Sequence, residues 1–194
     1  MFSEKMLEKF RSGGYAVSVF ESKEDACSYM LGRLAGKSVG VGGCMTAVEM
    51  GLMEKLPSVC KLSSHWNSAS FAEAAAADAY VLSANGVSES GEIVNIDGTG
   101  NRVASSIFGH KEVYFLIGNN KIEENLEKAI WRARNIASPL NAKRLGRNTP
   151  CASSGRCHDC QSPERICKAM TIHMQKPKGI EYCEIVFIDE SLGL

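Results

Sequence analysis

The sequence has 194 residues, of which 44% are hydrophobic and 23% charged, and its 22 Lys and Arg residues balance 22 Asp and Glu residues. This composition excludes a disordered or fibrous chain, and the zero net charge offers no basic field that would attract nucleic acid. The longest apolar runs, at 113–117 and 185–188, are far shorter than the roughly 20 residues of a spanning helix, which predicts no membrane insertion. Because residues 1–5 show no apolar signal core, we expect a cytoplasmic protein with a single domain over residues 1–194.

The chain alternates between short β-rich runs and segments with helical spacing of apolar residues. Ser22 can cap the first clear helix, Pro57 would end the second, and Asn120 stands where the last would be capped. The predicted strands cover residues 15–20, 38–41, 58–62, 79–83, 92–96, 113–117 and 184–188, and the predicted helices cover 23–34, 46–56, 68–77 and 122–136. This alternation predicts an α/β fold with a mostly parallel sheet flanked by helices.

A glycine turn follows the predicted strand at 38–41 and precedes a helix. Such a turn lets the backbone N–H groups of a helix start approach a phosphate, a carboxylate or an acyl oxygen. The candidate ligand-binding residues of the turn are Gly42, Gly43, Cys44 and Thr46. Thr46 and Glu49 also have the spacing of a capping box, so Glu49 is either a helix cap or a catalytic acid or base.

Two further polar loops follow predicted strands. Asp97 could orient a hydroxyl or act as a base, and Arg102 could clamp a carboxylate. The candidate ligand-binding residues of these loops are Asp97, Gly98, Thr99, Gly100, Asn101 and Arg102, followed by Asn120 and Lys121. One such loop is ordinary turn chemistry. Because three of them end strands of the predicted sheet, we expect them to border one hollow that binds a small anionic ligand.

Residues 141–168 form a cysteine-rich segment with little hydrophobic periodicity and an excess of basic residues. Its cysteines are Cys151, Cys157, Cys160 and Cys167. A two-residue spacer, as between Cys157 and Cys160, lets adjacent thiolates reach one metal, and a reducing compartment disfavours structural disulfides. We expect the four sulfurs to hold a metal ion or cluster; a redox pair and reduced structural thiols are the alternatives.

Three stretches taken in order resemble the LUD (lactate utilisation) domain family: 41–52 (VGGCMTAVEMGL), 91–103 (GEIVNIDGTGNRV) and 118–121 (GNNK). Residues 141–167 are similar to a cysteine-bearing branch of short standalone members, whereas Cys44 stands where the family would have serine. The resemblance implies the fold shared by ribose-5-phosphate isomerase, glucosamine-phosphate deaminase and CoA transferases. It also implies a part in the bacterial oxidation of L-lactate to pyruvate alongside iron–sulfur proteins, and it favours an iron–sulfur cluster over zinc in the cysteine segment.

The leading hypothesis is a ligand-binding or iron–sulfur oxidoreductase-accessory subunit of lactate utilisation, with iron–sulfur lactate-oxidation proteins as partners. An alternative is an independent enzyme that acts on a sugar phosphate or an acyl-CoA, with Glu49 or Asp97 as the base. A third interpretation is a structural metal site that closes a subunit interface. The fold alone does not distinguish these three hypotheses, so the choice depends on the geometry of the site.

Overall fold

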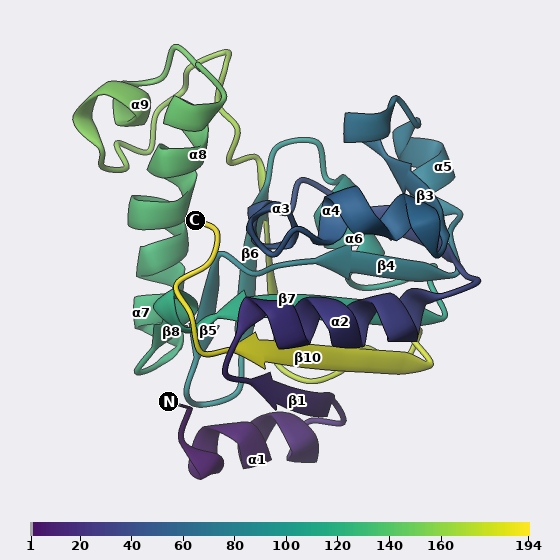
Figure 1. Cartoon of the computed structure of the whole chain (residues 1–194). Helices are drawn as coiled ribbons and strands as arrows, with labels where there is room; N and C mark the ends of the chain where they lie inside the picture. Colours follow the sequence, from purple (N-terminus) through teal and green to yellow (C-terminus); the bar gives the residue numbers. More distant parts are fainter. Residues whose placement is uncertain (1) are drawn as a thin grey trace.

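The computed structural model describes residues 2–194, and in this part of the chain the strands form two sheets (Figure 1). The larger sheet has six strands in the order β1-β10-β7-β4-β2-β3, and every pair in it is parallel. Its strands are β1 (Ala16–Phe20), β2 (Ser38–Val41), β3 (Lys61–Ser64), β4 (Ala79–Leu82), β7 (Glu112–Gly118) and β10 (Tyr182–Ile188). The expected α/β fold with a mostly parallel sheet is confirmed.

The smaller sheet has the order β8-β5-β6-β9 and is mainly antiparallel. Its strands are β5 (Gly86–Ser88), β6 (Ile93–Asp97), β8 (Ile122–Glu123) and β9 (Ala169–His173). The predicted strand at 92–96 is therefore present, but it lies outside the parallel sheet. The sequence did not predict β9, because this edge strand is largely exposed and shows no alternation of buried and exposed positions.

Helices cover one face of the large sheet, and α1 (Glu4–Ser12) with the small sheet covers the other (Figure 1). The first face packs against α2 (Lys23–Leu34), α3 (Met45–Glu49) and α4 (Leu52–Lys55). On the opposite face, Phe10 of α1 packs in one apolar cluster with Phe115 of β7 and Phe187 of β10. Both faces of the sheet are thus buried, which explains why its strands are nearly continuous apolar runs. Within residues 2–194 no helix is long and apolar enough to cross a bilayer.

A long helical segment packs on the far side of the small sheet and differs from the predicted helix at 122–136. It consists of α7 (Leu126–Arg132), a π-helical turn η4 (Ala133–Ala137) and α8 (Ser138–Arg144). The cap is Asn125, whose side chain accepts from the N–H of Lys128, and not Asn120. Pro139 does not end the helix, because it lies at the start of α8, where a missing N–H is tolerated.

The second predicted helix, at 46–56, is divided. Gly51 adopts a left-handed conformation (φ 69°), which ends α3 and starts α4. Pro57 belongs to a 3-10 turn, η1 (Leu56–Ser58), so the strand expected at 58–62 begins only at Lys61. The remaining short elements are η2 (His65–Asn67), α5 (Phe71–Ala75), α6 (Asn101–Ser105), η3 (Asn119–Lys121) and α9 (Pro150–Ser154).

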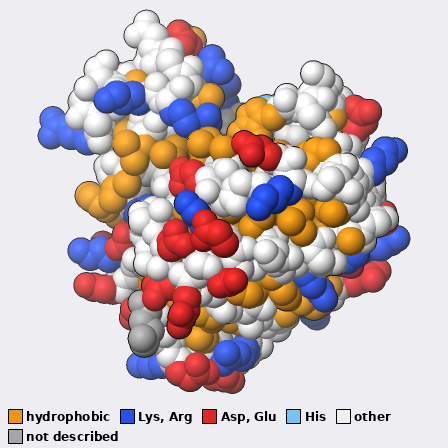
Figure 2. All heavy atoms as spheres, viewed as in Figure 1, with side chains coloured by type: hydrophobic (Ala, Val, Ile, Leu, Met, Phe, Trp, Pro, Cys, Tyr) orange, Lys and Arg blue, Asp and Glu red, His pale blue; other side chains and the backbone are white. Residues whose placement is uncertain are grey.

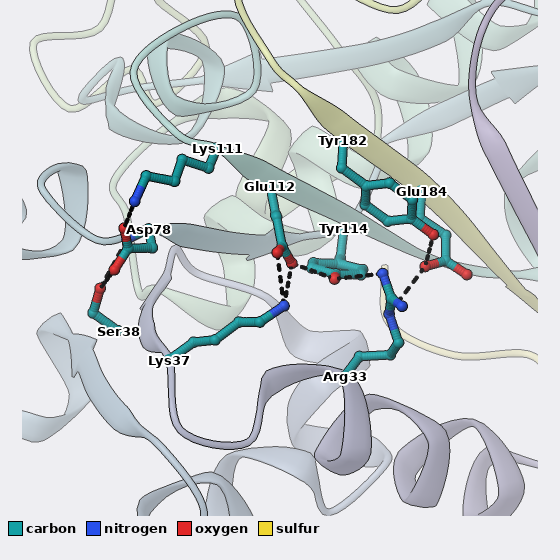
Figure 3. Close-up of polar contacts among 9 residues, drawn as sticks. All are labelled: Arg33, Lys37, Ser38, Asp78, Lys111, Glu112, Tyr114, Tyr182 and Glu184. Atoms are coloured by element: carbon teal, nitrogen blue, oxygen red, sulfur yellow. Dashed lines mark hydrogen bonds and ion pairs between the residues drawn. The ribbon is translucent and has the colours of Figure 1, made fainter.

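A buried carboxylate, that of Glu184, connects α2 with strands β1 and β10 of the large sheet (Figure 3). Glu184 of β10 has a side chain that is only 1% exposed, and its carboxylate accepts from Ser18 Oγ (2.6 Å), Tyr29 Oη (2.7 Å) and Tyr182 Oη (2.8 Å). Arg33 Nε lies 3.9 Å from the same carboxylate, and the Arg33 guanidinium stacks 4.8 Å from the centroid of the Tyr182 ring. These contacts satisfy a charge that would otherwise be costly to bury.

We therefore expect Glu184→Ala to lower the free energy of unfolding by about 3 kcal/mol, because it leaves the Arg33 guanidinium and three hydroxyls without their common acceptor. Urea unfolding monitored by circular dichroism measures this loss. Glu181→Ala, at an exposed carboxylate just before β10, is the matched control and should stay within about 0.5 kcal/mol of the unchanged protein. Equal stability of the two variants would contradict the role assigned to Glu184.

Candidate functional site

The three loops predicted to meet do border one hollow, of about 220 Å³. The predicted residues that line it are Gly43, Asp97, Gly98, Thr99, Asn101, Arg102 and Lys121. Figure 2 shows the surface hollowed between the body of the molecule and the lobe that carries α8 and α9. Residues 137–147 from that lobe form the opposite wall.

The loops converge for a reason that could be predicted from the sequence only in part. Gly43 and Lys121 follow β2 and β7, whose carboxyl ends lie at the same edge of the parallel sheet. Asp97 instead ends β6 of the small sheet, which brings its loop to this edge from the side. The hollow is therefore built at the junction of two sheets.

Asp97 holds the loop that follows it. Its Oδ1 accepts from the backbone N–H groups of Thr99 (3.1 Å) and Gly100 (3.2 Å), and its Oδ2 accepts from that of Arg102 (3.1 Å). The Arg102 guanidinium pairs with the same carboxylate at 3.3 Å and donates to the carbonyl of Ile96 at 2.6 Å. This geometry gives Asp97 a positioning role, and its action as a base stays a prediction.

Gly42 lies beneath the side chain of Arg102 and does not line the hollow. A Cβ at this position would lie 2.3 Å from Arg102 Cγ and 2.8 Å from Tyr80 Oη, so a side chain here would displace the arginine. Cys44 and Thr46 are buried, and neither they nor Gly100 are among the residues that line the hollow. Glycine is thus needed at Gly42 to seat the protein's own guanidinium.

Glu49 and Asn120 secure the segment that ends at residue 194. Glu49 Oε2 accepts from the N–H of Gly193 at 2.6 Å, while Asn120 donates to the Gly193 carbonyl and accepts from the N–H of Leu192 (3.2 Å each). The capping box expected of Thr46 and Glu49 is absent, because α3 is preceded by Cys44 and has no side-chain cap. Neither Glu49 nor Asn120 lines the hollow, so a catalytic role for Glu49 stays a prediction without support from this geometry.

Lys121 closes the floor of the hollow. Its side chain is 2% exposed, and Nζ donates to Thr46 Oγ1 (2.9 Å) and Ser83 Oγ (2.6 Å). Burial lowers the pKa of this amine from its ordinary value of 10.5 to about 8. A partly deprotonated amine at neutral to mildly alkaline pH is unusual for lysine and makes Lys121 a candidate for chemistry.

The sequence predictions missed eight polar or aromatic lining residues: His65, Phe71, Ser83, Asn85, Ser138, Asn141, Arg144 and Arg147. Ser83 and His65 directly follow β4 and β3, so the strand-end argument could have identified them once those boundaries were known. Arg144 and Arg147 belong to the basic segment around the cysteines, but nothing local in the sequence indicates that α8 folds back over the hollow.

The lining carries a positive charge. The described lining residues include four basic side chains, Arg102, Lys121, Arg144 and Arg147, and one acidic side chain, Asp97, which Arg102 already neutralises. Burial and the charge of Arg144 lower the pKa of His65, so its ring is neutral near pH 7. Such a field favours an anionic ligand.

The cysteine segment lies beside this hollow. A Cβ on Gly98 would lie 2.8 Å from the carbonyl oxygen of Ile166, so the loop after Asp97 and the segment touch. Cys157 and Cys167 line a second hollow of about 270 Å³, and Arg134 Nη2 lies 3.9 Å from Cys157 Sγ. Among residues 2–194 no group of three or more Cys, His, Asp or Glu side chains is arranged to hold a metal ion. Metal binding by the four cysteines and their convergence on one centre therefore stay predictions.

Comparison with known proteins decides the family, because the family model of the LUD domain matches residues 3–188. The chain belongs to the LUD domain family. Membership supports a role related to lactate utilisation. Among curated proteins, none matches the sequence.

A solved structure has a similar fold. The LUD domain is similar to the crystal structure of a DUF162 family protein from Deinococcus radiodurans, with a TM-score of 0.54, 13% sequence identity, and coverage of 95% of this chain and 94% of that chain. At this identity the similarity concerns the fold, and the residues of the hollow are argued from their own geometry.

The buried amine predicts a pH-dependent stability of this LUD domain. Because the folded pKa of Lys121, about 8, lies below its unfolded value, the unfolded state binds more protons between these two pH values, and the free energy of unfolding should rise with pH. Each pKa unit corresponds to about 1.4 kcal/mol. Urea unfolding at pH 7 to 10 should show this rise in the unchanged protein relative to Lys121→Met.

The exposed Lys128 supplies the control for that comparison. Lys128→Met should run parallel to the unchanged protein over the whole pH range. If Lys121→Met also runs parallel, the amine is not perturbed in the folded state.

Proposed function

We propose that the hollow binds a small anionic ligand, a carboxylate or a phosphate, and that the chain serves lactate utilisation as a ligand-binding or iron–sulfur oxidoreductase-accessory subunit. The observation that carries this proposal is the charge of the lining. Lys121 at the floor and Arg144 and Arg147 on the lobe have no acidic side chain left to pair with among the described lining residues, since that of Asp97 is paired with Arg102. Guanidinium groups suit carboxylate and phosphate oxygens in particular.

The family supports the context of this ligand. A role related to lactate utilisation makes L-lactate and pyruvate the first ligands to test, because both are small carboxylates. The partners would be the iron–sulfur proteins that oxidise lactate. The cytoplasm is the expected compartment for such a complex.

Arg144→Gln should weaken the binding of the anionic ligand about tenfold, because it removes one charge-assisted contact from the wall. Isothermal titration with L-lactate, pyruvate and inorganic phosphate measures the change. Lys143→Gln is the matched control, since Lys143 is an exposed cation on the same helix that does not line the hollow. Equal affinities of the two variants, or no binding of any of these anions, would overturn the proposal.

The alternative, an enzyme acting on a sugar phosphate or an acyl-CoA with Glu49 or Asp97 as base, has less support. Glu49 lies outside the hollow, and the carboxylate of Asp97 is already occupied by backbone donors and Arg102. A sugar phosphate that bound more tightly than L-lactate in the same titration, and turned over, would favour this alternative.

A second proposal concerns Cys151, Cys157, Cys160 and Cys167 as ligands of an iron–sulfur cluster or of zinc. The supporting observation is that Cys157 and Cys167, ten positions apart in the chain, line the same hollow together with basic side chains. If a group binds, thiolates of this segment would hold it, and its chemistry would be electron transfer for a cluster or structural closure for zinc.

Anaerobic purification followed by metal and sulfide analysis tests this second proposal. We expect iron and sulfide in the unchanged protein and their loss in Cys157→Ser. Cys60→Ser, a half-buried thiol outside the segment, should retain them. Zinc in place of iron would favour the structural interpretation, and a metal-free protein would contradict both.

A further inference from the structure

Lys121 combines two properties that seldom occur together. Its side chain is almost completely buried, yet it forms part of the lining of the hollow, at the end of η3 and directly after β7. Lysines are rarely fully buried unless they are paired with an opposite charge. The position therefore needs an explanation beyond packing.

The partners of the amine are neutral. Nζ donates to Thr46 Oγ1 and Ser83 Oγ, and Ser83 in turn donates to the carbonyl of Leu116 at 2.6 Å. Among residues 2–194 no carboxylate lies within ion-pair distance of this nitrogen. Two hydroxyls orient the amine without neutralising it, so the ammonium form is not favoured by a counter-charge.

The charged groups around Lys121 come from three helices and from the turn before α3. Arg102 of α6 and Arg132 of α7 disfavour the ammonium, and Arg132 is itself buried and donates to the carbonyl of Asn120 at 2.9 Å. Glu49 of α3 acts in the opposite direction, as does the thiolate form of Cys44, whose own pKa is raised by burial. Burial remains the largest effect and leaves a substantial fraction of free amine near pH 8.

We propose that Lys121 is a nucleophilic amine that forms an imine with a small carbonyl compound bearing an anionic group, of which the 2-oxo acid pyruvate is the simplest. This inference rests on the proposed anion-binding function of the same hollow. The basic side chains of the lining would hold the anionic group, while the amine at the floor meets the carbonyl carbon.

The reaction balances without an oxidant or a reductant. The lone pair of the neutral Lys121 nitrogen forms a bond to the carbonyl carbon, and the electrons of the C=O π bond move to oxygen, which takes up a proton. The nitrogen loses one proton, the hydroxyl group takes up a second proton and leaves as water, and the nitrogen lone pair forms the N=C bond of a protonated imine. Loss of the remaining N–H proton gives the neutral imine, so the net products are the imine and one water. A lysine in an apolar site next to other cations is an established setting for this nucleophile.

Reductive trapping tests the inference. The protein is incubated with pyruvate and sodium cyanoborohydride at pH 8, which converts an imine into a stable secondary amine. Intact-mass analysis should show one adduct, equal to pyruvic acid less one oxygen, and peptide mapping should place it on Lys121. Lys121→Arg should lose the adduct completely, and Lys128→Arg, at an exposed lysine, should retain it.

An adduct spread over exposed lysines, no adduct at all, or an adduct that survives in Lys121→Arg would overturn the inference. Circular dichroism of Lys121→Arg shows whether its loss of labelling reflects misfolding, and the position of the adduct in the unchanged protein does not depend on that variant. Titration with L-lactate, which has no carbonyl group to form an imine, separates the two proposals. Lactate binding without trapping would overturn the imine alone, whereas trapping at Lys121 without any effect of Arg144→Gln would overturn the anion-binding wall.

Discussion

The pair formed by Asp97 and Arg102 is the constraint on which the site depends. Asp97 ends a strand of the small sheet, and Arg102 reaches from the following helix across Gly42, the residue after β2 of the large sheet. Asp97 also contacts the end of the cysteine-rich segment, because its backbone carbonyl accepts from the N–H of Lys168 at 2.9 Å. One acidic residue thus fixes the relative position of two sheets and a lobe, and the hollow is the space left between them.

The sequence predicted best those elements whose signals are local. Ser22 and the apolar face after it correctly delimit α2, and the β-rich run before the glycine turn is β2 as expected. The errors occur where a residue's role depends on distant contacts. Asn120 resembles a helix cap, but it binds Leu192 and Gly193, and Glu49 has capping-box spacing but also binds Gly193. A short-range pattern cannot show that a segment 70 or more positions later takes the same hydrogen bonds.

The candidate site was predictable on one side only. Gly43, Asp97 and Lys121 follow strands, and polar residues at strand ends gather at a sheet edge whichever sheet they leave. The opposite wall comes from a helix that continues through Pro139 and folds over the hollow, which the change of composition there concealed. The burial of Lys121 could not be predicted from the sequence either, because its hydrogen-bond partners, Thr46 and Ser83, lie far from it in the chain.

The π-helical turn at 133–137 determines which side of α8 faces the hollow. Such a turn holds one residue more than the α-helical path requires, and each residue of an α-helix advances the side chains by about 100°. The inner wall of the hollow begins within this turn, at Ala137, and continues through Ser138, Asn141 and Arg144. Without the extra residue these side chains would rotate onto another face, and the guanidinium groups would point away from the sheet edge. A single irregular turn of the backbone therefore determines which side chains of the following helix line the hollow.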